Sequence, residues 1–463
     1  MKQPMYQNPI KAALPTEFQH VILISLDSLK FDCIQGKSKY IDKLLNNGTV
    51  FNRCITAAPY TTAAHAAYFT GCWPRNNNVY EFFNRSITKP TLFELAKKSG
   101  YKTIFQTDFP IILGDSIGFT KGVDKYFIED EESALNCLLK NHNQKTVSFF
   151  HFGGIHYPYG FHKLKFGGKD YENKVKHLER VLHIKQDDLV NDMLDESYRN
   201  KKDAQFLFRY KRILEKLDKD KKYIQIDILY REGIKYFMKN RFDKFIKKLL
   251  KFVERENAVL ILFADHGESW DSKSKGHANS ISHSVLHVPL VVYGNTIEKK
   301  KVNSLVRTID VLPTIFDLTG ITKSKVDGKS LLSPNLDDGR HALGQVWRTG
   351  NKHKVKLHQQ KILSKHGMIT PLKTHLEKEA IYLGNYALVN EYQNGKISKQ
   401  TTFSFTNTNN IIEAKIPKNI TPIMLRLLEQ YNNKDRKTTS NKKKLTSIEK
   451  QIVADLNLMG YNV

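Results

Sequence analysis

The chain alternates short apolar runs with longer segments whose apolar residues recur at helical spacing. Three continuous apolar runs cover residues 21–26, 146–152 and 258–264. Runs of this length predict strands that are buried on both faces of a parallel sheet. Amphipathic helices are predicted over 37–47, 131–141 and 224–256. We therefore expect an α/β fold with a doubly wound, mainly parallel sheet flanked by helices.

Three further patterns extend this α/β alternation. Residues 50–57 read as one strand that leads into a helix starting at Thr61. A helix over 90–99 precedes a strand over 101–105. Residues 307–320 predict a helix with Asp310 as its N-cap and Gly320 after its last turn.

The composition changes along the chain and suggests an order of domains. We expect an N-terminal extension over 1–19 and a catalytic α/β domain over 20–340, interrupted by a long, charged helical insertion over 163–222. A smaller α+β C-terminal lobe is expected over 341–463, with a flexible basic linker at 432–444. Its predicted elements are strands at 380–389 and 401–405 and helices at 421–431 and 446–459.

The chain is strongly basic, with 73 Lys and Arg against 47 Asp and Glu and a formal net charge of +26. This excess favours an anionic small-molecule or polymer substrate. A nucleic-acid partner stays possible, although no recognised nucleic-acid-binding motif is present. The four cysteines lie at no metal-ligand spacing, which predicts reduced thiols. The sequence shows no signal peptide and no apolar run long enough to span a membrane, so we expect a cytoplasmic protein. It does not indicate an oligomeric state.

The stretch from Pro59 to Gly71 carries the first candidate chemistry. Pro59 favours an extended lead-in, and the alanine-rich run after Thr61 and Thr62 favours a helix. This places a hydroxyl at a helix N-terminus, where backbone N–H groups and the helix dipole hold anions. Thr61 is the favoured nucleophile and Thr62 its only rival. His65 follows one turn after Thr61 on the same helical face.

Acidic and imidazole side chains follow the predicted buried strands. Asp27 ends the first strand, and Asp265 and His266 end the last. Because ligands gather at the carboxyl ends of parallel strands, these residues are candidate metal ligands. Carboxylate oxygen with imidazole nitrogen favours zinc or manganese over calcium. His156, after Gly153-Gly154, is predicted to lie in a rim loop over the site.

Three later histidines lie in different sequence contexts and are interpreted differently. His277 follows eleven residues after His266 in a loop too polar to belong to the core. His287 leads directly into a predicted strand and is interpreted as structural. The role of His283 stays open.

The order of these motifs resembles the sulfatase-like branch of the alkaline phosphatase/sulfatase superfamily, over residues 20–335. The matching words are Leu26-Asp27-Ser28-Leu29, Pro59 to Pro74, His156-Tyr157-Pro158-Tyr159, Asp265-His266-Gly267-Glu268, His287-Val288-Pro289-Leu290 and Asp310-Val311-Leu312-Pro313-Thr314. The resemblance implies one or two divalent ions, held by Asp27, Asp265 and His266 and touching the oxygen of Thr61. It also implies that His156 and His277 act in catalysis and contact the substrate, and we expect the same substrate contact for His65.

The chain departs from true sulfatases at the nucleophile. It has Thr61-Thr62-Ala63-Ala64-His65 in place of the Cys/Ser-x-Pro-Ser-Arg motif, and Ser28 where sulfatases often carry another carboxylate. A threonine nucleophile is similar to that of phosphodiesterase, phosphatase and headgroup-transferase members. We therefore expect a phosphate mono- or diester hydrolase that forms a covalent phospho-threonine. The alternatives are a phosphoryl or headgroup transferase, a sulfuric ester hydrolase, or a catalytically silent anion- or nucleic-acid-binding protein.

Overall fold

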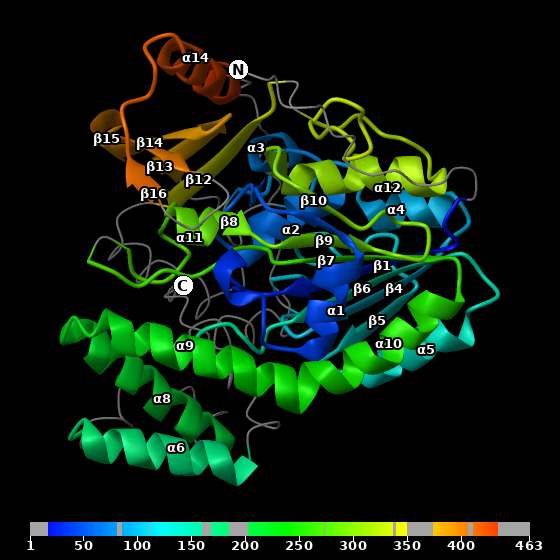
Figure 1. The fold of residues 1–463 in the computed structure, drawn as a ribbon, viewed down its shortest axis with the longest axis horizontal. Helices are drawn as coiled ribbons and strands as arrows, with labels where there is room; N and C mark the ends of the chain where they lie inside the picture. Colours follow the sequence, from blue (N-terminus) through cyan, green and yellow to red (C-terminus); the bar gives the residue numbers. More distant parts are fainter. Residues whose placement is uncertain are drawn as a thin grey trace, which may run out of the picture.

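The computed structural model describes residues 17–80, 86–110, 112–159, 168–184, 202–272, 274–336, 339–349, 374–405 and 411–433. Its centre is an eight-stranded sheet with the order β10-β2-β9-β7-β1-β6-β4-β5, which Figure 1 shows between two layers of helices. The strands of this sheet are β1 (His20–Leu26), β2 (Thr49–Phe51), β4 (Lys102–Thr107), β5 (Lys125–Ile128), β6 (Thr146–Phe152), β7 (Ala258–Phe263), β9 (Leu290–Tyr293) and β10 (Lys300–Val302).

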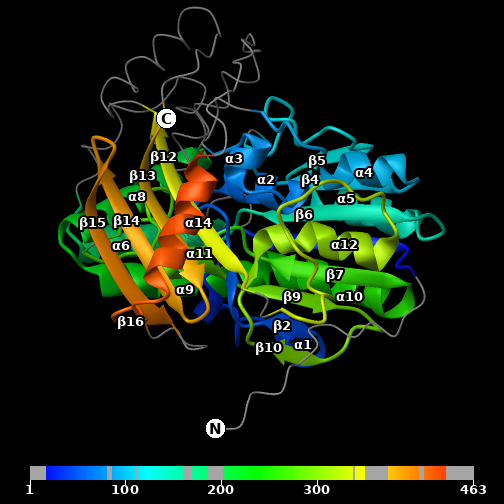
Figure 2. The same cartoon turned by 90° about the horizontal axis from the view of Figure 1, so that it is seen from above.

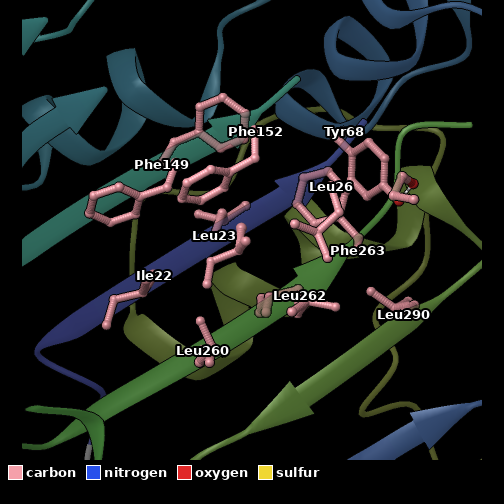
Figure 3. Close-up of a cluster of buried hydrophobic side chains, with 14 of the residues drawn as sticks. Ile22, Leu23, Leu26, Tyr68, Phe149, Phe152, Leu260, Leu262, Phe263 and Leu290 are labelled. Carbon is pink, nitrogen blue, oxygen red and sulfur yellow. Dashed lines mark hydrogen bonds between the residues drawn. The ribbon is translucent and has the colours of Figure 1, made fainter. Parts of the chain in front are cut away.

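The middle of this sheet consists of the three apolar runs predicted to be buried strands. β1 pairs in parallel with β6 on one side and with β7 on the other. Every residue of the three strands is buried. Figure 3 shows their side chains packed together, among them Leu23, Phe149 and Leu262. The prediction of a mainly parallel sheet buried on both faces is therefore confirmed.

Helices cover both faces of the large sheet, which is the doubly wound arrangement expected from the sequence (Figure 1). One layer contains α1 (Lys39–Asn47), α5 (Glu131–Lys140) and α10 (Asp243–Arg255), and the other contains α2 (Thr61–Thr70), α4 (Leu92–Lys98) and α12 (Val311–Thr319). Helix α10 shows why such a layer forms, because its Phe245, Ile246 and Leu249 are buried while the intervening lysines face outward. Short helices α3 (Pro74–Asn77) and α11 (His283–Leu286) complete this part.

The predicted single strand over 50–57 is wrong. It is divided by a turn at Asn52-Arg53, so that β2 joins the large sheet while β3 (Cys54–Ile55) pairs with β8 (His287–Val288) and β11 (Val306–Arg307) in a second, three-stranded sheet. The turn is fixed by Arg53, whose Nη1 donates to the Asn303 carbonyl at 3.3 Å. Its guanidinium also lies 4.4 Å from the centre of the Phe405 ring.

The predicted capping role of Asp310 is also corrected. Asp310 is the N-cap residue of α12 by position, as predicted, but its side chain makes no capping hydrogen bond to that helix; within the preceding 3-10 turn it accepts from the Arg307 N–H at 3.0 Å. Its carboxylate also accepts from the guanidinium of Arg307 at 2.7 Å and from that of Arg340 at 3.3 Å. The Asp310 carboxylate is therefore hydrogen-bonded to two buried guanidinium groups and not to the first N–H groups of α12.

Helices in the predicted insertion form a separate layer to one side of the large sheet, at the lower left of Figure 1. They are α6 (Gly168–Val181) and α8 (Lys202–Lys219), followed by α9 (Tyr223–Phe237). The single helix predicted over 224–256 is α9 and α10 joined by a π-helical turn, Met238–Phe242. The layer reaches the rim loop, since the Tyr157 hydroxyl donates to the Lys211 carbonyl at 3.2 Å. Residues 160–167 and 185–201 of this region lie outside the described residues.

A separate antiparallel sheet and one helix make up the C-terminal part, to one side of the large sheet (Figure 2). The sheet contains β12 (His341–Thr349), β13 (Thr374–Leu383), β14 (Tyr386–Gln393), β15 (Lys396–Phe405) and β16 (Ile411–Glu413). The strand predicted over 380–389 is in fact a hairpin that turns at Gly384-Asn385. Helix α14 (Thr421–Asn433) confirms the prediction at 421–431. The predicted helix at 446–459 and residues 434–444 of the basic linker lie outside the described residues.

Across the described ranges, no helix combines the length and the apolar composition that a membrane crossing requires.

Candidate active site and metal centre

Two strand ends and one helix start bring the candidate metal ligands together. Asp27 follows β1, while Asp265 and His266 follow its parallel neighbour β7. One ligand atom from each of these three residues lies within 4.8 Å of the others, and all three side chains are fully buried. The adjacency follows from the fold, because parallel strands end at the same edge of the sheet. The predicted ligand set is thus assembled in one place.

Thr61 lies against this cluster at the first residue of α2. Its hydroxyl donates to Asp27 Oδ2 at 3.1 Å and lies 3.4 Å from His266 Nε2. The hydroxyl of the rival Thr62 is buried and has no hydrogen-bond partner among the described residues. The geometry therefore favours Thr61 as the alcohol beside the metal ligands.

The donor atoms fit a divalent cation. Asp265 Oδ2 is buried without a hydrogen-bond partner in the described part of the chain, although it faces His266 Nε2 at 3.4 Å. His266 Nδ1 donates to the Gly267 carbonyl at 2.9 Å, which leaves the Nε2 lone pair for a metal. Oxygen and imidazole donors of this kind suit zinc or manganese.

The two carboxyl groups have opposite pKa shifts. Burial and the neighbouring charge of Asp27 raise the pKa of Asp265 well above its ordinary value. Burial also acts to raise the pKa of Asp27, but the hydrogen bond from His151 and the nearby imidazoles hold it well below the usual range. Two buried acids that resist joint ionisation are stabilised by a cation between them.

His65 lies beside the cluster, with its Nδ1 3.8 Å from Asp265 Oδ2, and both of its ring nitrogens form hydrogen bonds. Its Nδ1 donates to the Thr61 carbonyl at 2.8 Å, and its Nε2 accepts from the Ser25 hydroxyl at 2.9 Å. It is fully buried, and burial lowers its pKa to about 3. The structure thus connects His65 to the backbone of the proposed nucleophile, while its predicted contact with substrate stays a prediction.

His151 is a neighbour of the site that the sequence interpretation missed. It lies in β6, and its Nε2 donates to Asp27 Oδ2 at 3.1 Å. Its Nδ1 lies 3.3 Å from the Thr107 hydroxyl of β4. The available signal was a histidine near the end of an otherwise apolar strand, but its target depends on strand order, which the sequence does not specify.

The rim of the site carries His156 and His277, whose ring centres are 5.0 Å apart. His156 Nδ1 donates to the Tyr157 carbonyl at 2.9 Å. The ring centre of His277 stacks 4.2 Å from that of His266, a candidate metal ligand. The structure therefore brings both predicted rim histidines close to the candidate metal ligands.

Glu268 is a second residue whose role the sequence interpretation did not assign. Its Oε2 accepts from His277 Nδ1 at 3.1 Å, and both side chains are buried. Burial raises the pKa of Glu268 to about 7. The carboxyl group fixes the tautomer of His277, with the ring proton on Nδ1.

Comparison with known proteins gives a family match for this chain. The family model described as "Sulfatase" matches residues 19–321. The low-salt glycan biosynthesis sulfotransferase Agl7 of Haloferax volcanii is 23% identical over 340 residues, which cover 72% of this chain and 69% of that protein.

Two solved structures support the fold. A protein in complex with its substrate D-glucosamine-2-N,6-O-disulfate has a TM-score of 0.62 at 15% identity, covering 91% of this chain and 99% of its own. The phosphonate monoester hydrolase SpPMH from Silicibacter pomeroyi has a TM-score of 0.57 at 13% identity, covering 92% and 99%. The family model spans most of the chain and includes every candidate site residue, from Asp27 to His277. This chain belongs to the sulfatase family and has the fold of an ester hydrolase of the alkaline phosphatase superfamily.

Proposed function

We propose that this sulfatase-family protein is a metal-dependent hydrolase of phosphate esters and that Thr61 is its nucleophile. The observation that carries the proposal is the Thr61 hydroxyl, which donates to Asp27 and lies 3.4 Å from His266, two members of the candidate metal cluster. A threonine cannot become the oxidised aldehyde of true sulfatases, so the attacking group is the side-chain alcohol itself. An alcohol nucleophile beside a metal suits phosphoryl transfer.

The metal would be held by Asp27, Asp265 and His266, with zinc or manganese as the preferred ion. When bound, it supplies Lewis-acid polarisation and lowers the pKa of a neighbouring alcohol. Thr61 Oγ1 attacks phosphorus while Asp27 Oδ2 receives its hydrogen bond. The backbone N–H groups at the start of α2 point toward the equatorial oxygens and stabilise their charge.

The two rim histidines complete the proton balance. As the Thr61 oxygen–phosphorus bond forms, the hydroxyl proton of Thr61 passes to His156 or His277, and that histidine gives it to the leaving oxygen as the bond from phosphorus to this oxygen breaks. Water then attacks the phospho-threonine and loses a proton to the same histidine, which returns a proton to the Thr61 oxygen as its bond to phosphorus breaks. Glu268 supports this exchange by holding the His277 ring through Nδ1.

Two other reactions are compatible with the same residues. A transferase would use an acceptor alcohol in place of water in the second step, and the sulfotransferase among the relatives gives this alternative its support. A sulfuric ester hydrolase would bind the sulfate group with the same backbone N–H groups at the start of α2. A silent anion- or nucleic-acid-binding protein is the alternative of another class, and the net charge of +26 is compatible with either ligand.

A substrate panel tests the proposal. Purified protein should be assayed with zinc and with manganese on aryl phosphate monoesters, phosphate diesters, phosphonates and sulfates. We expect turnover of a phosphate ester, and we expect Thr61→Ala to abolish it while the matched neighbour Thr62→Ala keeps it. Turnover of sulfates alone, or equal activity of Thr61→Ala and wild type, would contradict the proposal. The expected cytoplasmic location and the partners stay predictions.

A further inference from the structure

Ser28 has a backbone conformation that is uncommon for a residue other than glycine. It has a φ of +63° directly after the metal ligand Asp27. In this left-handed conformation its N–H donates to Asp265 Oδ1 at 3.2 Å, and its hydroxyl donates to Asp27 Oδ1 at 2.7 Å. One strained residue thus orients both carboxylates of the metal cluster. Such strain persists only where the surrounding structure enforces it.

Tyr230 of α9 is the side chain that encloses this residue. Its hydroxyl donates to the Ser28 carbonyl at 2.7 Å and accepts from the Lys30 N–H at 2.9 Å. The side chain is buried, with 1% of its surface exposed. The phenol therefore bridges two backbone groups two residues apart and closes the turn that contains Ser28.

Helix α9 is fastened to the same segment on both sides of Tyr230. Asp227 forms an ion pair with Lys30 at 2.5 Å, and Arg231 forms one with Asp32 at 2.8 Å. The Lys30 ammonium also lies 4.8 Å from the centre of the Tyr230 ring. These contacts fix the position of the Tyr230 side chain relative to the turn. Its hydroxyl is therefore already placed for both hydrogen bonds.

We propose that Tyr230 is a positioning residue of the metal centre, which acts through Ser28 to hold Asp27 and Asp265 in metal-binding geometry. The order of contacts is Tyr230 to the Ser28 backbone and then Ser28 to the two carboxylates. Helix α9, about 200 residues after β1 in the chain, thereby helps to position the metal ligands and does not only pack beside them. The inference rests on the metal cluster and is independent of which ester is cleaved.

The direct test is zinc affinity of the purified full chain, measured by competition with a chromophoric chelator in the absence of substrate. Tyr230→Phe keeps the ring and removes the hydroxyl. We expect zinc to bind about 10-fold more weakly, in the range found when supporting residues of metal ligands are removed. Unchanged zinc affinity would overturn the proposal.

Tyr101→Phe is the matched control. Its hydroxyl also bonds to two backbone groups, the carbonyls of Phe18 at 3.2 Å and Thr319 at 3.0 Å. Tyr101, however, directly precedes β4 and so lies at the amino ends of the parallel strands, opposite to the candidate metal site. We expect this variant to bind zinc as wild type does, whatever its effect on thermal stability. Equal weakening by both tyrosine variants would reduce Tyr230 to a general structural role and overturn the proposal.

A glycine at position 28 tests the route through Ser28. Glycine adopts a positive φ without strain. In the Ser28→Gly variant the turn therefore depends less on the two hydrogen bonds of the Tyr230 hydroxyl. Tyr230→Phe should therefore weaken zinc binding clearly less in the Ser28→Gly background than in wild type. The same fold-change in both backgrounds would mean that Tyr230 acts by another route. If Tyr230→Phe does not fold, Ser28→Ala still tests the second step: it removes the donor to Asp27 and should weaken zinc binding, and unchanged affinity would overturn the proposal.

Discussion

Two buried histidine clusters in this protein differ in what their ring nitrogens meet. In the cluster at the strand ends, His65, His151 and His266 have hydroxyl, carboxylate or carbonyl partners. In the second cluster, both ring nitrogens of His283 and Nδ1 of His287 have no hydrogen-bond partner among the described residues. Both clusters are almost completely buried. Burial is therefore common to both clusters, and only the acidic and hydroxyl partners distinguish the candidate site from the second cluster.

The second cluster lies where the C-terminal sheet meets the rest of the fold. The His283 ring centre is 4.9 Å from that of Phe405 in β15, and His287 stacks on Phe31 at 4.2 Å. His287 Nε2 donates to the Asn52 carbonyl at 2.8 Å. These aromatic and backbone neighbours support a packing role, which agrees with the structural interpretation of His287 and extends it to His283.

The largest contrast is expected from removing a metal ligand. His266→Ala should lose bound zinc or manganese and reduce ester hydrolysis by at least about 1000-fold, because the ion stabilises the transition state by several kcal/mol. His283→Ala should retain the metal and the activity of wild type. Metal content by elemental analysis, together with turnover rates, measures both variants. A His266→Ala protein with full metal content would refute the ligand assignment.

One identical substitution in both clusters sharpens the comparison. His151→Phe removes the donor to Asp27 and should weaken metal binding about 10-fold. His283→Phe removes no hydrogen bond among the described residues and places an aromatic ring beside Phe405, so metal affinity should not change. Chelator competition compares the two. Equal effects would mean that position relative to Asp27 does not matter.

The Glu268–His277 pair predicts an effect on rate with little effect on substrate affinity. Glu268→Ala should lower kcat about 10-fold to 100-fold, since His277 would lose the acceptor that orients its ring. Glu268→Gln keeps an oxygen acceptor in the same place and should recover most of the rate. A rise in KM at constant kcat would point to substrate binding instead.

The last prediction concerns stability in acid and leaves catalysis unaffected. Burial lowers the pKa of His287 from 6.5 to about 4. Below pH 6.5 the unfolded chain binds this proton and the folded chain does not, so stability is fully present above pH 6.5 and is lost as the pH falls toward 4. This single group accounts for up to about 3 kcal/mol of unfolding free energy.

His287→Phe isolates this contribution, because other buried histidines titrate in both proteins. Urea unfolding at pH 7 and at pH 4.5 should lose less free energy in the variant than in wild type. An equal loss would indicate that His287 is already protonated in the folded protein.

The sequence predicts those parts of the fold that follow from local pattern. The three apolar runs identify β1, β6 and β7, and parallel strands necessarily bring Asp27, Asp265 and His266 to one edge. It does not predict that a turn at Asn52-Arg53 divides the 50–57 run, because the contact of Arg53 with Phe405 joins residues far apart in the chain.

The supporting residues of the site escape sequence interpretation for the same reason. His151 reaches Asp27 only because β6 is the neighbour of β1. Ser28 looks like a simple replacement for a carboxylate, yet its φ of +63° determines what it donates to. Tyr230 reads as one more apolar position on an amphipathic helix. The meeting of side chains at strand ends is thus predictable, whereas the residues that orient these candidate ligands depend on tertiary contacts. The predicted domain boundaries stay predictions.

The most direct test of the account is to find the covalent intermediate. The wild-type protein, loaded with zinc or manganese, should be mixed with an aryl phosphate, quenched in acid during the first turnovers and digested for mass spectrometry. We predict a phosphoryl group on Thr61 that forms before product release is complete and is absent from Thr61→Ala. Turnover with no adduct on Thr61, or an adduct on another residue at a kinetically competent rate, would contradict the central claim.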